Sequence, residues 1–159
     1  MPIDQAREFA KGHVLFWHHA LVLQHGRATS NPDASIEAEV DAQLFAVALR
    51  NVIRAVKACR PWAENEIDEA LDVFDDEVPR AVDIRDVLEH FDEYERGDGK
   101  LQRKQRDAGR APFTVVRWTE ETPGHLRYRI AEGLMLNVTP AFEAGSTLAG
   151  AALHALTDW

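Results

Sequence analysis

The spacing of apolar residues changes once along this chain, and that change limits the folds that the chain can adopt. Up to residue 97, apolar residues recur every three or four positions, a pattern typical of amphipathic helices. Beyond Pro112 they alternate with polar residues, as in strands that are covered on one side. The sequence therefore predicts a mainly α protein that carries a short β segment.

Helical periodicity predicts four helices before residue 97. The first is followed by Gly26, Pro61 ends the second, and Pro79 opens the fourth. The fourth has the sequence DIRDVLEHFDEYERG, whose apolar residues have three-to-four spacing. The expected helices cover about residues 3–25, 35–60, 63–76 and 80–96. We expect them to form an antiparallel four-helix bundle.

The remaining part of the chain is expected to hold a loop, three strands and a helix. Residues 97–110 have turn residues at both ends and are rich in basic side chains, so they predict a basic loop. The stretches TVVRWT, HLRYRI and LMLNVT then predict a three-strand antiparallel β-meander. Thr139 and Pro140 are a suitable N-cap and first turn for a terminal helix, rich in Gly and Ala, that reaches about Thr157.

Length and composition predict one cytoplasmic domain. A chain of 159 residues can bury a core without disulfides or metal. Its single cysteine, Cys59, lies on an apolar helix face and is expected in the core. We expect no membrane partner, because no apolar run is long enough to span a bilayer. The net charge of −9 argues against non-specific binding of nucleic acid by the whole surface, although a local basic site is compatible with it.

Arg85, Asp86 and His90 are the candidate catalytic residues, and all three lie on the predicted fourth helix. Asp86 precedes His90 by one helical turn, so its carboxylate can accept from one imidazole nitrogen and fix the tautomer. The other nitrogen can then move a proton. Arg85 offers a planar set of donors that suits phosphate oxygens. The other interpretation is that Arg85 and His90 make ordinary surface pairs with Asp86, Glu89 or Asp92.

This pattern of Arg, Asp, three further residues and His resembles the signature of the HEPN superfamily of small helical domains. The resemblance covers residues 1–97, while residues 98–159 hold the basic loop, meander and terminal helix packed on the same domain. It implies a metal-independent endoribonuclease that needs no cofactor, is linked to toxin–antitoxin or antiviral systems, and cleaves single-stranded RNA by 2′-hydroxyl attack. A cognate antitoxin is then a candidate partner. Asp92 stands where one subgroup of the family has Tyr.

A homodimer is expected, because Arg85 and His90 lie on opposite shoulders of one helix and form an incomplete site alone. A two-fold axis near these helices would bring Arg85 of one subunit toward His90 of the other. RNA is the expected ligand of the basic loop, whose cations can contact phosphates; a solvated loop that balances the acidic third helix is the alternative. The candidate RNA-binding residues are Lys100, Arg103, Lys104 and Arg106.

Two other functions stay open. The pattern Glu-x-x-Glu, followed by Glu-x-x-Asp, is similar to the Mg²⁺-binding pattern of the all-α nucleoside triphosphate pyrophosphatases; its residues are Glu66, Glu69, Glu89 and Asp92. The chain can also be a non-catalytic HEPN binding module. The four histidines of the first helix have poor spacing for metal ligands, and are expected at a dimer surface or at the helix end: His13, His18, His19 and His25.

Overall fold

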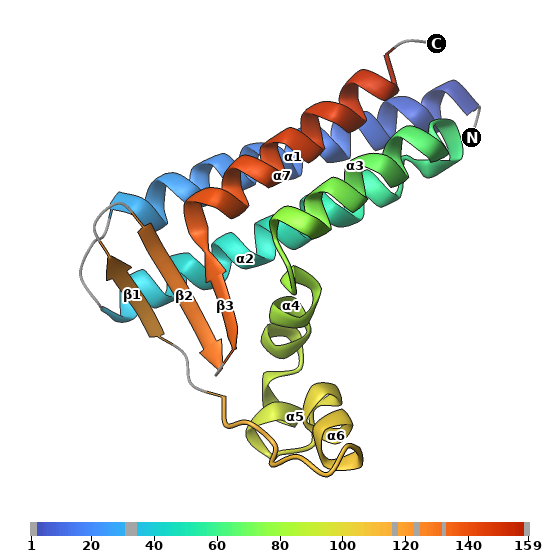
Figure 1. Cartoon of the computed structure of the whole chain (residues 1–159). Coiled ribbons are helices and arrows are strands. Elements are labelled where there is room, and N and C mark those ends of the chain that lie inside the picture. The colour runs from blue at the N-terminus through green and yellow to red at the C-terminus, as the bar shows by residue number, and fades with distance from the viewer. Residues whose placement is uncertain (1–2, 31–34, 116–117, 123–124, 132, 158–159) are drawn as a thin grey trace.

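The computed structural model describes residues 3–30, 35–115, 118–122, 125–131 and 133–157. For Arg85 and for residues 118–122 and 125, only the backbone is described. Within these ranges the chain is mainly α, with seven α-helices, one short 3₁₀ helix and three strands. Figure 1 shows two parts. Long helices form a bundle at the end of the molecule that holds both chain termini, and a small sheet and three short helices lie toward the opposite end.

Four long helices form an up-and-down bundle: α1 (Ile3–Ser30), α2 (Ile36–Lys57), α3 (Glu64–Glu77) and α7 (Val138–Ala155). The Ser35 hydroxyl caps α2 by accepting from the amide of Ala38 at 3.2 Å. α2 is followed by a 3₁₀ turn (Arg60–Trp62) that contains Pro61, the residue expected to end the helix. The predicted helices at 35–60 and 63–76 are therefore confirmed to within a few residues.

The terminal helix is the fourth helix of the bundle. α7 packs against α1, α2 and α3, whereas the residues expected to complete the bundle, 80–96, pack on α2 and the sheet. Close approach is possible because α7 carries Gly145 at its crossing: a Cβ there would lie 2.6 Å from Leu49 Cδ1 and 3.0 Å from Leu21 Cδ2. The Gly and Ala content of this helix thus serves tight packing.

α1 continues past Gly26, where the sequence predicted its end. The last turn is held because the Thr29 hydroxyl donates to the carbonyl of His25 at 2.8 Å and the Ser30 hydroxyl donates to that of Gly26 at 2.6 Å. Ala28 is fully buried in this turn. Burial and these bonds offset the roughly 1 kcal/mol cost of a glycine inside a helix.

The predicted three-strand meander is confirmed as a sheet of order β1-β2-β3, with both pairs antiparallel. Its strands are β1 (Trp118–Thr122), β2 (His125–Ala131) and β3 (Leu134–Asn137). Residues 114 and 115, expected in the first strand, are not in a strand, and 116 and 117 lie outside the described residues. Along β2, Leu126, Tyr128 and Ile130 are buried, which is the alternation expected of a sheet covered on one face. The sheet packs on α7, α4 and α2.

The predicted helix at 80–96 is wrong as a single helix. It is divided into α4 (Ala81–Glu89) and α5 (Phe91–Glu95), with His90 between them in a non-helical conformation (φ −114°, ψ 33°). The break lets the Tyr94 hydroxyl donate to the Asp86 carboxylate at 2.7 Å. In a continuous helix these residues would be separated by about 12 Å along the axis.

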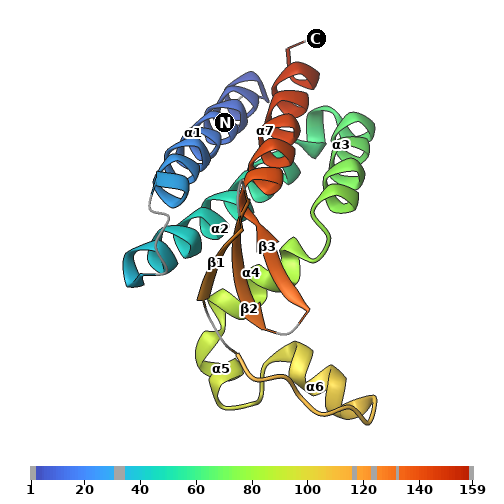
Figure 2. The same ribbon diagram turned by 60° about the vertical axis from the view of Figure 1, so that its left-hand side comes forward.

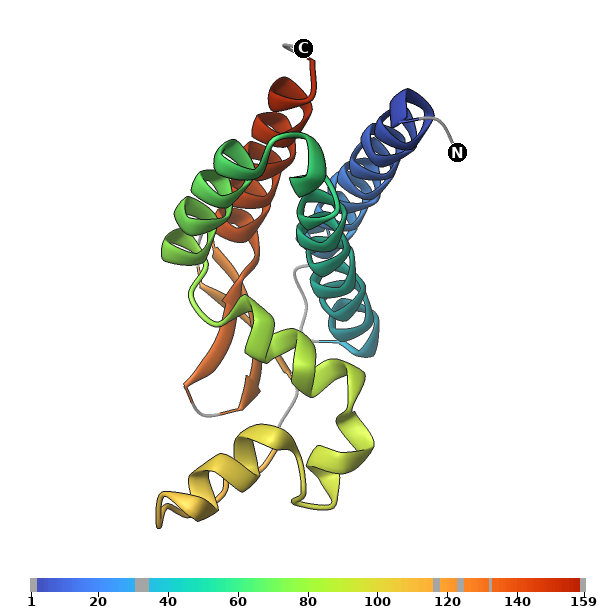
Figure 3. The ribbon, with the colours of Figure 1, turned by 90° about the vertical axis from the view of Figure 1, so that its right-hand side faces the viewer.

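The predicted basic loop is also corrected, because its centre is a helix, α6 (Lys100–Asp107). The buried amide of Gln102 holds this helix in place. Its Nε2 donates to the carbonyls of Tyr94 (3.0 Å) and Phe113 (2.8 Å), and its Oε1 accepts from the amide of Gly99 (3.0 Å). Figures 2 and 3 show α5 and α6 as an arm at the end of the molecule away from the two chain ends.

Within the described ranges, no helix has the length and apolar character that crossing a bilayer requires. Cys59 is fully buried, as expected, and burial raises the pKa of its thiol to about 11.

Candidate functional site

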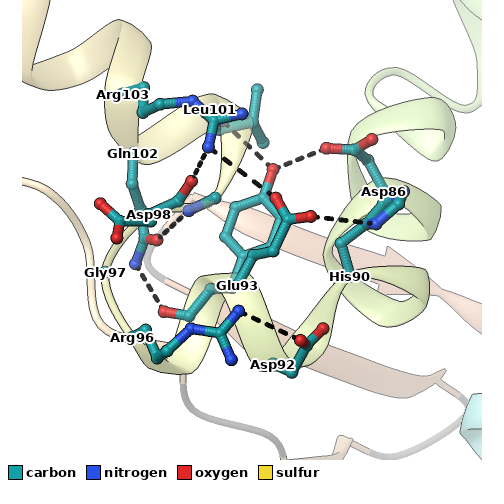
Figure 4. Close-up of polar contacts among 12 residues, drawn as sticks. Asp86, His90, Asp92, Glu93, Arg96, Gly97, Asp98, Leu101, Gln102 and Arg103 are labelled. Carbon is teal, nitrogen blue, oxygen red and sulfur yellow. Dashed lines mark hydrogen bonds and ion pairs between the residues drawn. The ribbon is translucent and has the colours of Figure 1, made fainter.

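His90 lies at the junction of α4 and α5, and its side chain is 50% exposed. Its Nδ1 lies 3.6 Å from Oε1 of Glu93, one turn later. Figure 4 shows this pair facing α6, beside the Asp86 carboxylate. A carboxylate next to one imidazole nitrogen orients the ring and leaves the other nitrogen for a substrate. Proton transfer at this exposed position is therefore chemically feasible.

Asp86 has a different role from the predicted one. Its carboxylate accepts from Tyr94, and the Tyr94 oxygen in turn accepts from the amide of Leu101 at 3.2 Å. Burial, followed by the hydrogen bond to Asp86, raises the pKa of Tyr94 to about 12, so the phenol stays a donor at neutral pH. This chain of bonds connects α4 to α6. The carboxylate that accompanies His90 is instead that of Glu93.

Four basic residues of α6 are exposed and are called its basic face below: Lys100, Arg103, Lys104 and Arg106. Lys100 and Lys104 lie opposite the buried Gln102, whereas Arg106 follows Gln102 by one turn. Arg103 and Arg106 donate to backbone carbonyls of the preceding turn, and Arg106 also lies 3.0 Å from the Asp98 carboxylate. Arg103 Nη1 lies 3.8 Å from Glu93 Oε2, so the basic face reaches the carboxylate that accompanies His90. Of these four residues, Arg103 therefore lies near the carboxylate that accompanies His90.

Position 85 lies on another side of α4. At about 100° per residue, positions 85 and 90 are separated by about 140° around the helix axis. Its neighbours one turn away on the same side of α4 are Val82, three residues before it, and Glu89, four residues after it. Glu89 forms an ion pair with Arg50 of α2. The placement of Arg85 and His90 on opposite shoulders stays a prediction, because only the backbone of Arg85 is described.

The four carboxylates of the magnesium hypothesis lie apart. Glu66 and Glu69 line a groove of about 560 Å³ between α3 and α7. Glu89 pairs with Arg50, and Asp92 lies 3.2 Å from Arg96. Among the described residues, no three His, Cys, Asp or Glu side chains gather where they could hold a metal ion. The arrangement therefore does not reproduce two facing pairs of carboxylates.

His25, from the histidine group of α1, packs against another helix. Its ring stacks on Phe142 of α7, with centroids 4.0 Å apart and planes at 11°, and lies 3.5 Å from the Thr139 hydroxyl. His25 therefore has a packing role between α1 and α7.

Comparisons with protein families, curated proteins and solved structures gave no match for this chain. The site therefore has to be understood from its own geometry. Glu93, Tyr94 and Gln102 are the residues that the sequence analysis missed as parts of it. A spacing of three residues between His90 and Glu93 was the available signal for the first of them.

Proposed function

We propose that the chain is a metal-independent endoribonuclease of the HEPN type, which cleaves single-stranded RNA at the end of α4. One observation carries the proposal: a half-exposed His90 has a carboxylate 3.6 Å from Nδ1 and stands beside the basic face of α6. This arrangement combines a proton-transfer group with cations that attract phosphate. Neither component requires a metal ion.

The proposed reaction uses the substrate's own hydroxyl as the nucleophile. His90 takes the proton from the ribose 2′-hydroxyl, whose oxygen attacks the adjacent phosphorus. The bond to the 5′-oxygen breaks, and that oxygen leaves with a proton. The products are a 2′,3′-cyclic phosphate and a 5′-hydroxyl. Arg85 and the cations of α6 are proposed to stabilise the charge that develops on the non-bridging oxygens.

The test measures cleavage of a single-stranded RNA oligonucleotide in excess EDTA, with the product ends identified by mass spectrometry. We expect cyclic phosphate ends, and a rate that falls by roughly two to four orders of magnitude in His90→Ala. Arg85→Ala should cause a similar loss. His154→Ala, which changes an exposed histidine near the end of α7, is the matched control and should retain full activity.

Two further variants separate the roles of the carboxylates. Glu93→Gln should lower the rate, because Glu93 accompanies His90, whereas Asp86→Asn should act mainly on stability through Tyr94. Hydrolysis of nucleoside triphosphates that needs Mg²⁺ and is abolished by Glu66→Gln or Glu89→Gln, but not by His90→Ala, would overturn the proposal in favour of a pyrophosphatase. If neither substrate is turned over, a binding module is the remaining account.

The proposed enzyme is a homodimer, and the exposed apolar residues indicate α1 as its interface. Six large apolar side chains are exposed on α1, and three more follow on the first half of α2: Ile3, Phe9, Leu15, Phe16, Val22, Leu23, Ile36, Val40 and Leu44. A large exposed apolar patch typically marks an interaction surface. At roughly 100 Å² per side chain, these residues present on the order of 900 Å², similar to the roughly 800 Å² per partner of a stable interface.

A further inference from the structure

A second cluster of charged residues surrounds a cavity between α2, α4 and β3. The cavity has a volume of about 290 Å³. Its apolar lining comes from all three elements and consists of Ala46, Leu49, Ile53, Ala81, Val82, Ile84 and Leu136. The polar part of the lining is entirely cationic and comes from one helix: Arg50, Arg54 and Lys57 of α2. This combination of an aliphatic wall and a cationic edge suits a ligand with an anionic head and an apolar body.

The three cations lie on one face of α2, because their spacings of four and three residues place them within about 60° around the axis. Arg54 and Lys57 are exposed. Glu89 is the carboxylate that the structure pairs with Arg50. The residues that line the cavity include these three cations and no carboxylate, so its edge is basic in a chain of net charge −9. The contrast favours a local site for an anion over general attraction of polyanions.

Cations also stabilise a helix when they occupy its last turn, by about 0.3–1 kcal/mol each. That effect accounts for the presence of Arg54 and Lys57 near the end of α2. It does not account for the aliphatic cavity that opens beside them, where additional apolar side chains would normally fill the space. The cavity is therefore the observation that indicates a ligand.

The cavity adjoins the helix that carries the catalytic candidates. Ala81, Val82 and Ile84 of α4 line it, and Glu89, which pairs with Arg50, directly precedes His90. Val82 and His90 are separated by about 12 Å along the axis of α4. A short stretch of single-stranded RNA can span this distance.

We propose that the cavity is a nucleotide subsite of the ribonuclease, an inference that rests on the proposed function. The phosphate lies between Arg54 and Lys57, and the base lies against the aliphatic wall formed by Leu49, Ile53 and Leu136. A nucleotide held here fixes the strand along α4, so that a phosphodiester bond a few residues away reaches His90. The subsite binds a phosphate and one base without contributing to proton transfer.

The test titrates the full chain with AMP and with UMP in EDTA and follows binding by calorimetry. We expect saturable binding that Arg54→Gln together with Lys57→Gln weakens by at least about tenfold and makes less sensitive to salt. Arg60→Gln is the matched control. Arg60 is an exposed cation three residues after Lys57, but it pairs with Asp68 at 2.7 Å and does not line the cavity. It should leave the affinity unchanged.

Octanoate and inorganic phosphate serve as the other probes. Tight binding of octanoate without binding of AMP or UMP would overturn the proposal in favour of a site for aliphatic anions, and equal binding of phosphate and AMP would overturn the role of the apolar wall. His90→Ala should leave mononucleotide affinity unchanged. A chain that binds AMP but cleaves no RNA therefore contradicts the proposed function alone, and a chain that cleaves RNA but binds no mononucleotide contradicts the subsite alone.

Discussion

His25 makes the stability of the bundle depend on pH. Its ring is stacked between α1 and α7, and burial lowers its pKa below 6.5, although the nearby Glu143 carboxylate acts in the opposite direction. The unfolded chain therefore binds a proton at His25 more readily than the native chain does just below pH 6.5. The free energy of unfolding contributed by this residue is complete above pH 6.5 and decreases as the pH falls through the lowered pKa.

We therefore predict that urea denaturation midpoints fall between pH 7.5 and pH 5.5, and fall less in His25→Phe, which retains an aromatic ring but does not titrate. Comparing the variant with the natural chain removes the effect of all other groups. The same decrease in both proteins would show that His25 stays accessible to protons in the native state.

At the same scale, the sequence predicted part of the candidate site. Helical periodicity, which depends on local spacing alone, located α4, the helix that carries Asp86 and is followed by His90. The partner of Asp86 did not follow, because a bond from Tyr94, eight residues later, requires the helix to break. Nothing in the local sequence fixes that break.

At the scale of elements, the α5–α6 arm depends on one phenol. Tyr94 is almost fully buried, donates to Asp86 and accepts from the amide of Leu101. Tyr94→Phe leaves both groups without this partner, so we predict a loss of about 1–3 kcal/mol in the free energy of unfolding. Hydrogen exchange should show faster exchange at the Leu101 amide, while amides in α2 are affected less.

Asp92→Asn is the control for this prediction, because the Asp92–Arg96 pair is exposed and should contribute less than about 1 kcal/mol. Unchanged exchange at Leu101 in Tyr94→Phe would mean that the arm is held mainly by Gln102. The variant also has a functional use, since a loosened arm should reduce RNA cleavage without abolishing it.

The sequence predicted well those helices and strands that are held in place by apolar side chains. α2 and α3 have apolar residues at helical spacing, and the strands alternate, so simple periodicity located them. α6 was missed because its anchor is the polar side chain of Gln102, which adds nothing to an apolar pattern. Gly26 gave a false stop, since burial of Ala28 outweighed the cost of the glycine.

At the scale of the whole molecule, we predict that the chain dimerises through α1. Light scattering should give a dimer for the natural chain at micromolar concentration and a monomer for Phe9→Glu together with Phe16→Glu, because both side chains are more than 60% exposed. Val73→Glu, which places a charge on the exposed side of α3, is the control and should remain dimeric. A monomeric natural chain would contradict the interface.

A mixing experiment places the axis. If subunits exchange but meet through α1, Arg85→Ala and His90→Ala chains should remain inactive when mixed, because such an interface does not bring Arg85 of one subunit to His90 of the other. Recovered cleavage in the mixture would instead show that Arg85 of one subunit acts with His90 of the other, as expected for an axis between the α4 helices.

The central position of α7 also determines when this protein can fold during its synthesis. The three helices that it contacts end at Glu77, and residues 78–137 must be translated before α7 begins. At about 5–20 residues per second, this interval lasts roughly 3–12 seconds. During that time the faces of α1, α2 and α3 that α7 covers are open to other nascent chains and to chaperones. Closure of the bundle is thus a late event, and a ribosome stalled before Val138 would display a chain that holds its helices without their common partner.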